Sequence, residues 1–258
     1  MTTIIPIPAF RDNYIWAVRD GAKAAVVDPG DAAPVLAWLD ANGVHLSAII
    51  ATHHHADHVG GVAELCAKYD VPVFGPAREA IPRRTHALSE GDRIEVPGVG
   101  LACVLFDIPG HTAGHIAYYT AGDDPLLFCG DTLFAAGCGR IFEGTPEQMW
   151  ASLSKLAGLP AATRVYCGHE YTLANLAFAQ AVEPGNDDVR ARIGRERVKR
   201  DRNLPTLPST IGDELATNPF LRAGLPGVMA SAAAHAKRPM ASVVDSFATL
   251  RQWKNEFR

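Results

Sequence analysis

Short apolar runs bounded by Gly, Pro and Asp fill the first 170 residues of the chain, a pattern typical of strands joined by turns. The runs that predict strands are 24–30, 46–53, 71–76, 92–98, 99–110, 115–120, 125–131 and 163–169. Two helices interrupt them. One is expected to start at Val59, because apolar residues recur at helical spacing from there to Tyr69. The other is expected to open at Thr145, where Thr-Pro-Glu-Gln offers an N-cap, a proline and a capping-box glutamine. This order predicts a layered α/β sandwich.

The pattern changes to helix from Tyr171 onward, which predicts a small helical domain or appendage. Helices are expected over 171–182 and 187–202, followed by a proline-containing connection over 203–226 and two more helical runs ending at Arg258. The stretch DDVRARIGRERVKRDRN (187–203) carries seven basic residues. Interspersed acidic residues favour a solvated helix face over a nucleic-acid contact.

Composition and charge are those of an ordinary globular protein. The chain has 258 residues, of which 48% are hydrophobic and 20% charged, and its net charge of −4 predicts neither a nucleic-acid nor a membrane partner. No apolar run approaches the roughly 18 residues of a membrane span, and the start MTTIIPIPAF does not resemble a signal peptide. We therefore expect a cytoplasmic protein. The five cysteines are widely spaced and form no CxxC pair, so neither a disulfide framework nor a thiolate zinc site is indicated.

Histidine is distributed unevenly, since four of the 10 histidines lie within the segment THHHADHVGG. If the backbone after the strand stays extended, His53, His55 and Asp57 point to one side and His54 points away. His58 would lie near the start of the following helix. Imidazole and carboxylate groups converging at a strand end suit a divalent metal ion.

Three more donors follow predicted strands in glycine-rich segments: His111 in PGHTAGH, Asp131 in CGDT and His169 in CGHE. Taken singly, Asp131 could be a helix N-cap and His111 a turn residue. Together with the cluster they make seven donors, which exceed the coordination of one ion. The expected arrangement is two metal ions, one held by His53, His55 and His111, the other by Asp57, His58 and His169, with Asp131 bridging them.

These residues resemble a known family. His-x-His-x-Asp-His followed by a His, an Asp and a His is the pattern of the metallo-β-lactamase superfamily, over residues 1–170. FRDNYIW (10–16), VVDPG (26–30), GDTLFAAGCGR (130–140) and GHEYTLANLAFA (168–179) look like glyoxalase II, the hydroxyacylglutathione hydrolases. The resemblance implies a four-layer αββα sandwich over 1–170, a C-terminal helical substrate-binding domain over 171–258 and the same division of metal ligands. It also implies that Asp28 is no ligand but holds the ligand loop, and that His115 has at most an indirect role.

The activity implied by this family is hydrolysis of the thioester S-D-lactoylglutathione to D-lactate and glutathione, the second step of methylglyoxal detoxification. A hydroxide between two divalent metal ions would attack the thioester, beside the catalytic carboxylates Asp57 and Asp131. We expect zinc, with iron or manganese as alternatives, because imidazole and carboxylate accept all three. The small-molecule glutathione thioester is the expected partner, and we expect a monomer.

Substrate contacts are implied for Arg140, Phe142, Tyr171, Arg251 and Lys254. Arg251 and Lys254 are three residues apart and share a helix face, which suits a carboxylate. Many glyoxalase II sequences carry Lys at the position of Arg140 and Tyr at that of Phe142, so this chain lacks one hydroxyl.

The alternatives are a persulfide dioxygenase, a β-lactam hydrolase, a nucleic-acid-processing hydrolase or a non-catalytic metal-binding module. The helical tail with LRQWK and the complete second set of metal donors argue against the first two. A nucleic-acid enzyme would want a basic binding appendage, and a non-catalytic module would have no use for seven donors around an open metal pair.

Overall fold

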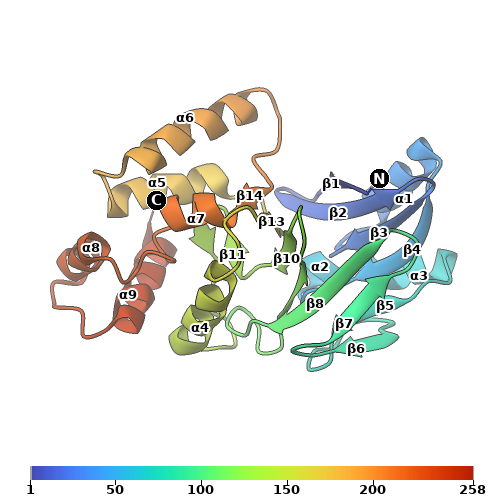
Figure 1. Cartoon of the computed structure of the whole chain (residues 1–258), viewed down its shortest axis with the longest axis horizontal. Coiled ribbons are helices and arrows are strands. Elements are labelled where there is room, and N and C mark those ends of the chain that lie inside the picture. Colours follow the sequence, from blue (N-terminus) through green and yellow to red (C-terminus); the bar gives the residue numbers. More distant parts are fainter. Residues whose placement is uncertain (1, 258) are drawn as a thin grey trace.

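The computed structural model describes residues 2–257 and contains two six-stranded sheets (Figure 1). The first sheet has the order β1 (Thr3–Ala9), β2 (Asn13–Asp20), β3 (Lys23–Val27), β4 (His45–Ile50), β5 (Val73–Pro76) and β6 (His86–Leu88). The second has the order β14 (Ser209–Thr210), β13 (Arg164–Cys167), β10 (Leu126–Gly130), β9 (Ile116–Thr120), β8 (Leu101–Asp107) and β7 (Arg93–Val96). Both sheets mix parallel and antiparallel pairs. A small hairpin, β11 (Leu133–Phe134) and β12 (Gly137–Cys138), follows β10.

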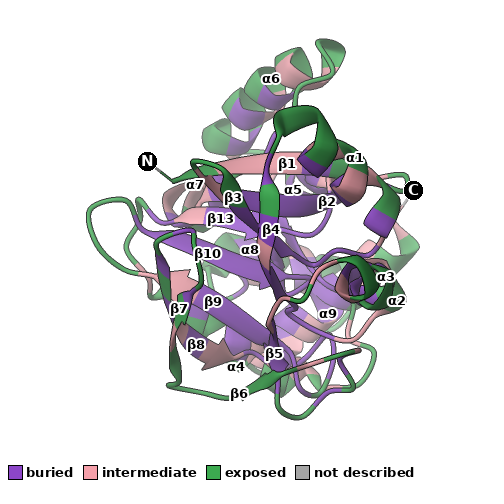
Figure 2. Cartoon of the chain, turned by 90° about the vertical axis from the view of Figure 1, so that its right-hand side faces the viewer, coloured by how far each residue is buried: buried purple, intermediate pink, exposed green. Residues whose placement is uncertain are grey.

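Helices cover both outer faces of the paired sheets. They are α1 (Ala32–Asn42), α2 (Ala56–Val59), α3 (Val62–Lys68), α4 (Pro146–Ala157), α5 (Thr172–Val182), α6 (Asp187–Asp201), α7 (Ile211–Thr217), α8 (Pro226–Ala236) and α9 (Val243–Glu256). Side chains alternate along β2: Trp16 and Val18 pack between the sheets, while Ile15 and Ala17 pack toward α1 and α3. The strands are therefore buried on both faces, as the purple centre of Figure 2 shows. The predicted αββα sandwich with a C-terminal helical region is confirmed.

The local predictions agree with the structure where the apolar pattern is continuous. Each of the eight predicted strands corresponds to an observed strand, from β3 to β13. The capping box of α4 is confirmed, since Thr145 Oγ1 accepts from the Gln148 amide at 3.3 Å and Gln148 Oε1 accepts from the Thr145 amide at 2.9 Å.

The sequence prediction missed several elements and misjudged the extent of others. The sequence reasoning omitted β1 and β2, because Pro6 and Pro8 interrupt the first of them; β1 lies at the sheet edge, where proline is tolerated. It also omitted α1. The helix expected to start at Val59 is two helices, α2 and α3, separated where the Gly61 amide donates to the Pro29 carbonyl at 2.9 Å. The connection 203–226 contains α7.

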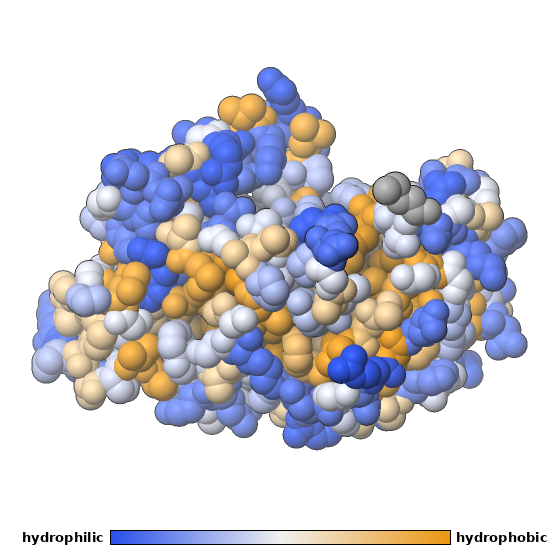
Figure 3. Space-filling model, viewed as in Figure 1, coloured by the Kyte–Doolittle hydropathy of each residue, from blue (hydrophilic) through white to orange (hydrophobic). Residues whose placement is uncertain are grey.

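The helices α5 to α9 gather at one end of the sandwich, on the left of Figure 1. Hydrophilic side chains cover most of α6, at the upper left of Figure 3. Five of the seven basic residues predicted there lie within ion-pair distance of an acidic side chain: Arg190, Arg192, Arg195, Lys199 and Arg200. Among residues 2–257, no helix is both long and apolar enough to cross a membrane.

Candidate active site

Three histidines form one cluster at the ends of β4 and β9. His55 Nδ1 lies 3.2 Å from His53 Nε2 and 3.0 Å from His111 Nε2. His53 and His55 follow β4, and His111 lies in the loop before β9. The structure therefore brings together the three donors that the sequence assigned to one metal ion.

Hydrogen bonds on the far side of two rings fix where their protons lie. The His111 Nδ1–H donates to the Arg140 carbonyl at 2.8 Å. Thr52 donates its only hydroxyl proton to Asp28, so its oxygen accepts from the His53 Nδ1–H at 3.0 Å. Burial holds the pKa of His53 and of His111 below the ordinary histidine value, so both rings are neutral. Their Nε2 lone pairs then face the same small space, an arrangement that a cation stabilises.

A second cluster contains Asp57, His58 and His169, again one of the predicted sets. Asp57 Oδ2 lies 3.5 Å from His58 Nε2 and 3.4 Å from His169 Nε2. Here carboxylates dominate the electrostatics. Burial lowers the pKa of His169, but the charge of Asp131 and hydrogen bonds to Asp131 and Asp57 outweigh it and raise that pKa to about 10. The electrostatic potential at this cluster is thus more negative than at the first.

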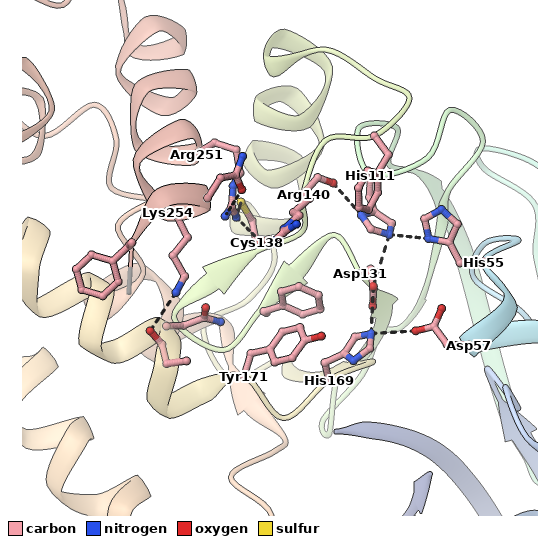
Figure 4. Close-up of a pocket in the computed structure, with 16 residues that line it drawn as sticks. His55, Asp57, His111, Asp131, Cys138, Arg140, His169, Tyr171, Arg251 and Lys254 are labelled. Carbon is pink, nitrogen blue, oxygen red and sulfur yellow. Dashed lines mark hydrogen bonds and ion pairs between the residues drawn. The ribbon is translucent and has the colours of Figure 1, made fainter. Parts of the chain in front are cut away.

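Asp131 faces both clusters. Its Oδ2 lies 3.5 Å from His111 Nε2 and 3.2 Å from His169 Nε2 (Figure 4). Its Oδ1 lies 3.3 Å from His58 Nε2. Burial raises its pKa, but the charges on His58 and His169 outweigh burial, and the net pKa lies well below the ordinary value. The carboxylate is therefore ionised in the position expected of a bridging ligand.

Two buried polar atoms test whether a metal pair fits. His58 Nε2 and Asp131 Oδ1 have no hydrogen-bond partner, although both are inaccessible to solvent. Unpartnered buried polar atoms of this kind are costly unless an ion or water binds them. Gly168 leaves the necessary space, because a Cβ there would lie 2.6 Å from His58 Cε1 and 2.7 Å from Asp131 Oδ1. The donor set and the space fit a binuclear site for divalent cations.

Polar groups behind the donors orient them. Asp28 accepts from the Thr52 amide at 2.7 Å and from the His58 Nδ1–H at 3.1 Å, which matches the role that the sequence assigned to it. Asp12 accepts from the His169 Nδ1–H at 2.8 Å, and Asn13 donates to Asp57 Oδ2 at 3.0 Å. Sequence reasoning missed Asp12 and Asn13, although both lie in the quoted motif FRDNYIW.

Two other histidines near the clusters differ in role. His54 turns away, with Nδ1 3.0 Å from Glu79 and Nε2 3.3 Å from Glu143. His115 is fully buried, stacks on His53 at 4.6 Å and accepts from the Asp131 amide at 3.2 Å. His115 therefore supports two predicted ligands without belonging to either cluster, which agrees with the indirect role expected for it.

A cavity of about 490 Å³ opens from the metal donors toward the C-terminal helices. Figure 4 shows His55, Asp57 and His111 at one end and Arg251 and Lys254 at the other. All five residues expected to contact the substrate line this cavity: Arg140, Phe142, Tyr171, Arg251 and Lys254.

The aromatic members of that set lie against histidines of the clusters. The Tyr171 ring stacks on His169 at 4.7 Å, nearly parallel to it. The Phe142 ring meets His55 edge-on at 5.7 Å and His111 at 5.2 Å, and its side chain is 61% exposed. These rings form apolar walls beside the space between the donors.

The two cationic side chains at the far end of the cavity, Lys254 and Arg251, differ in their surroundings. Lys254 is half-buried, and burial together with the charges of Arg251 and Arg140 lowers its pKa. Arg251 is buried, and its guanidinium donates to the Cys138 carbonyl at 2.7 Å and to Asn255 at 3.1 Å. Both terminal nitrogens thus have partners within the protein while the buried Nε has none, which the shared helix face alone did not indicate.

Comparisons with known proteins cover the whole chain. Residues 9–169 match the family model described as metallo-beta-lactamase superfamily, and residues 170–257 match the one described as hydroxyacylglutathione hydrolase C-terminus. The chain is 57% identical to the hydroxyacylglutathione hydrolase of Alkalilimnicola ehrlichii over 258 residues, covering 99% of this chain and 100% of that one. It is 50% identical to that of Nitrosomonas europaea, over 100% of this chain and 97% of that one. The crystal structure of ETHE1 from Myxococcus xanthus has a similar fold, with a TM-score of 0.65 at 22% identity over 98% of this chain and 99% of that one.

Proposed function

This chain belongs to the hydroxyacylglutathione hydrolases (glyoxalase II) of the metallo-beta-lactamase superfamily, and on that premise we propose that it hydrolyses S-D-lactoylglutathione to D-lactate and glutathione. One observation carries the proposal. The same cavity is lined by candidate metal donors of both clusters at one end and by cationic side chains at the other, where a thioester with carboxylate groups can reach both.

The metal ligands we propose are His53, His55 and His111 for one cation and Asp57, His58 and His169 for the other, with Asp131 shared. Zinc is the proposed metal, because imidazole nitrogen and carboxylate oxygen are among its usual ligands. Iron and manganese accept the same donors and are the alternatives. When bound, two such cations supply Lewis acidity and a nucleophile derived from water near neutral pH.

Asp57 and Asp131 are the proposed catalytic carboxylates. Burial raises the pKa of Asp57, but the hydrogen bond from His169 and the charge of His58 outweigh it and hold that pKa below its ordinary value. Both carboxylates are therefore ionised at neutral pH. Asp131 faces both clusters and Asp57 belongs to the second, and from there their oxygens accept hydrogen bonds from the attacking water and orient it toward the thioester carbonyl.

Substrate binding is proposed for the cationic end of the cavity. Arg140 and Lys254 attract the glutathione carboxylates, and Arg251 shapes the wall behind them. Phe142 and Tyr171 flank the acyl group and exclude water from it. A thiolate leaves readily, so the absence of a general acid among these proposed substrate residues is consistent with thioester cleavage.

The two proposed roles, metal binding and substrate binding, belong to consecutive parts of the chain. We propose that residues 1–170 form the catalytic metal-binding domain and 171–258 the substrate-binding domain, acting together as a monomer. The test is direct: purified protein should contain about two metal equivalents and hydrolyse S-D-lactoylglutathione. A metal-replete sample that leaves this thioester intact while cleaving RNA or a β-lactam would overturn the proposal.

A further inference from the structure

The β11–β12 hairpin lies between the metal donors and the C-terminal helices. It begins two residues after Asp131 and ends two residues before Arg140. In Figure 4 it crosses the space between Asp131 and Arg251. A displacement of this hairpin would therefore move residues at both ends of the cavity.

The base of the hairpin packs directly against two predicted ligands. Gly139 fits so closely that a Cβ there would lie 1.9 Å from the Asp131 carbonyl oxygen and 3.1 Å from His111 Nδ1. The next residue, Arg140, offers the carbonyl that accepts from His111 at 2.8 Å. The hairpin thereby sets the ring orientation of His111 and the backbone of Asp131.

The tip of the hairpin has a backbone conformation that alanine rarely adopts. Ala136 has φ of 53°, in the left-handed region that favours glycine. Its amide donates to Glu214 Oε2 of α7 at 2.7 Å, and Asn218 donates to the Gly137 carbonyl at 2.9 Å. Surrounding contacts must hold such a residue in place. Of these two hydrogen bonds, the one to Glu214 is the shorter and the one made by Ala136 itself.

Glu214 is completely buried and its other contacts lie within the helical region. Its Oε1 accepts from Arg192 of α6 at 2.8 Å and from the Ser209 hydroxyl, and its Oε2 accepts from Asn218 at 2.9 Å. One carboxylate thus joins α6, α7 and β14 to the tip of the hairpin. All four partners donate to it, so both carboxylate oxygens act as acceptors.

We propose that Glu214 is a positioning residue of the metal centre. By holding Ala136, it fixes the hairpin and through it Asp131 and His111, so the helical region contributes to metal binding as well as to the substrate cavity. The inference rests on the proposed function, since it takes Asp131 and His111 as metal ligands.

The test compares cobalt-loaded holoenzymes of wild type and Glu214→Gln. The amide preserves the size of the side chain but places an N–H₂ group against a donor in either orientation. We expect cobalt to be lost to a competing chelator at about tenfold lower chelator concentration, as for other groups that orient metal ligands. The visible absorption band of bound Co²⁺ should change, and kcat should fall with KM nearly constant.

Two further variants separate positioning from general stability. Glu183→Gln breaks a comparable pair, in which Glu183 accepts from Arg222 at 2.8 and 2.9 Å without touching the hairpin, and should leave cobalt retention and spectrum unchanged. Adding Ala136→Gly to Glu214→Gln should restore much of the cobalt retention, because glycine adopts the left-handed conformation without help.

Unchanged cobalt retention and spectrum in Glu214→Gln, or equal losses in Glu183→Gln, would overturn the proposal. If Glu214→Gln does not fold, Glu214→Asp keeps the carboxylate but shortens its reach to the Ala136 amide; normal cobalt retention there contradicts the proposal and weakened retention supports it. Thioester hydrolysis by wild type is measured separately, so a failure of the proposed function is recognised independently of these cobalt measurements.

Discussion

The Nδ1–H of His58 donates to Asp28 Oδ2 over 3.1 Å, and both side chains are buried. The bond turns Nε2 of the same ring toward Asp131, where it has no hydrogen-bond partner. Asp28 has φ of 53° and also accepts from the amide and hydroxyl of Thr52. A single carboxylate therefore orients one donor of the second cluster and anchors the start of the loop that carries His53, His55 and Asp57.

Asp28→Asn should weaken metal binding by about 10- to 100-fold, the usual effect of losing a group that orients a metal ligand. Asparagine tolerates the left-handed backbone, so the loss reports on the hydrogen bonds to His58 and Thr52. Metal content after dialysis against a chelator measures it. Asp31→Asn is the matched control, because asparagine caps α1 as well as aspartate does; equal metal loss in both variants would contradict this role.

Neighbouring histidines provide a second test. His55→Ala removes a donor of the first cluster, so the protein should bind about one metal equivalent fewer and lose more than about 100-fold in kcat. His54→Ala should keep both metal equivalents, because His54 faces Glu79 and Glu143 instead. Metal analysis and thioester hydrolysis of both variants decide. Loss of metal from His54→Ala with retention in His55→Ala would reverse the assignment.

Lys254→Ala should raise KM by about tenfold with little change in kcat, because a hydrogen bond to a charged group contributes about 1.5–3 kcal/mol to binding. Lys254 lines the cavity far from the metal donors. Initial-rate kinetics with S-D-lactoylglutathione measure the effect. Arg197→Ala removes a charge from the exposed face of α6 and should change neither constant. A fall in kcat alone would place Lys254 in the chemical step.

The start of α9 should respond to acid. Hydrogen bonds from Arg238 and the Ala241 amide lower the pKa of Asp245 to about 2. Because the folded-state pKa lies below the unfolded value, this contribution to stability is complete above about pH 4 and is lost as the pH falls toward 2. Thermal unfolding should show wild type more stable than Asp245→Asn at pH 6, with the difference shrinking toward pH 3. A difference that does not depend on pH would exclude this explanation.

Sequence patterns predicted the layers of the fold because strands buried on both faces have continuous apolar runs. They missed β1, where Pro6 and Pro8 hide an edge strand, and α7, a seven-residue helix whose N-cap Thr210 lies among prolines. These two short elements are stabilised by packing against a neighbour more than by their own sequence, whereas β2 and α1 were missed despite clear apolar patterns.

The candidate site shows the same limit. The donors stood out because histidines and aspartates follow strands in one local pattern. Asp12 did not, because its role depends on a contact with His169 from a distant part of the chain, and for the same reason the sequence could not name Asp131 as the partner of His115. Arg251 looked like a free cation on a helix face, whereas only the fold reveals its bond to the Cys138 carbonyl.

The donors are shared between the two sheets. The loop after β4 supplies two donors to each cluster, and loops next to strands of the second sheet supply the third, His111 or His169. Neither sheet alone could complete a ligand set, so bound cations would act as crosslinks that close the sandwich. Metal uptake in a refolding experiment would then report when the two sheets come together. A chelator would weaken the contact between the sheets before either sheet unfolded.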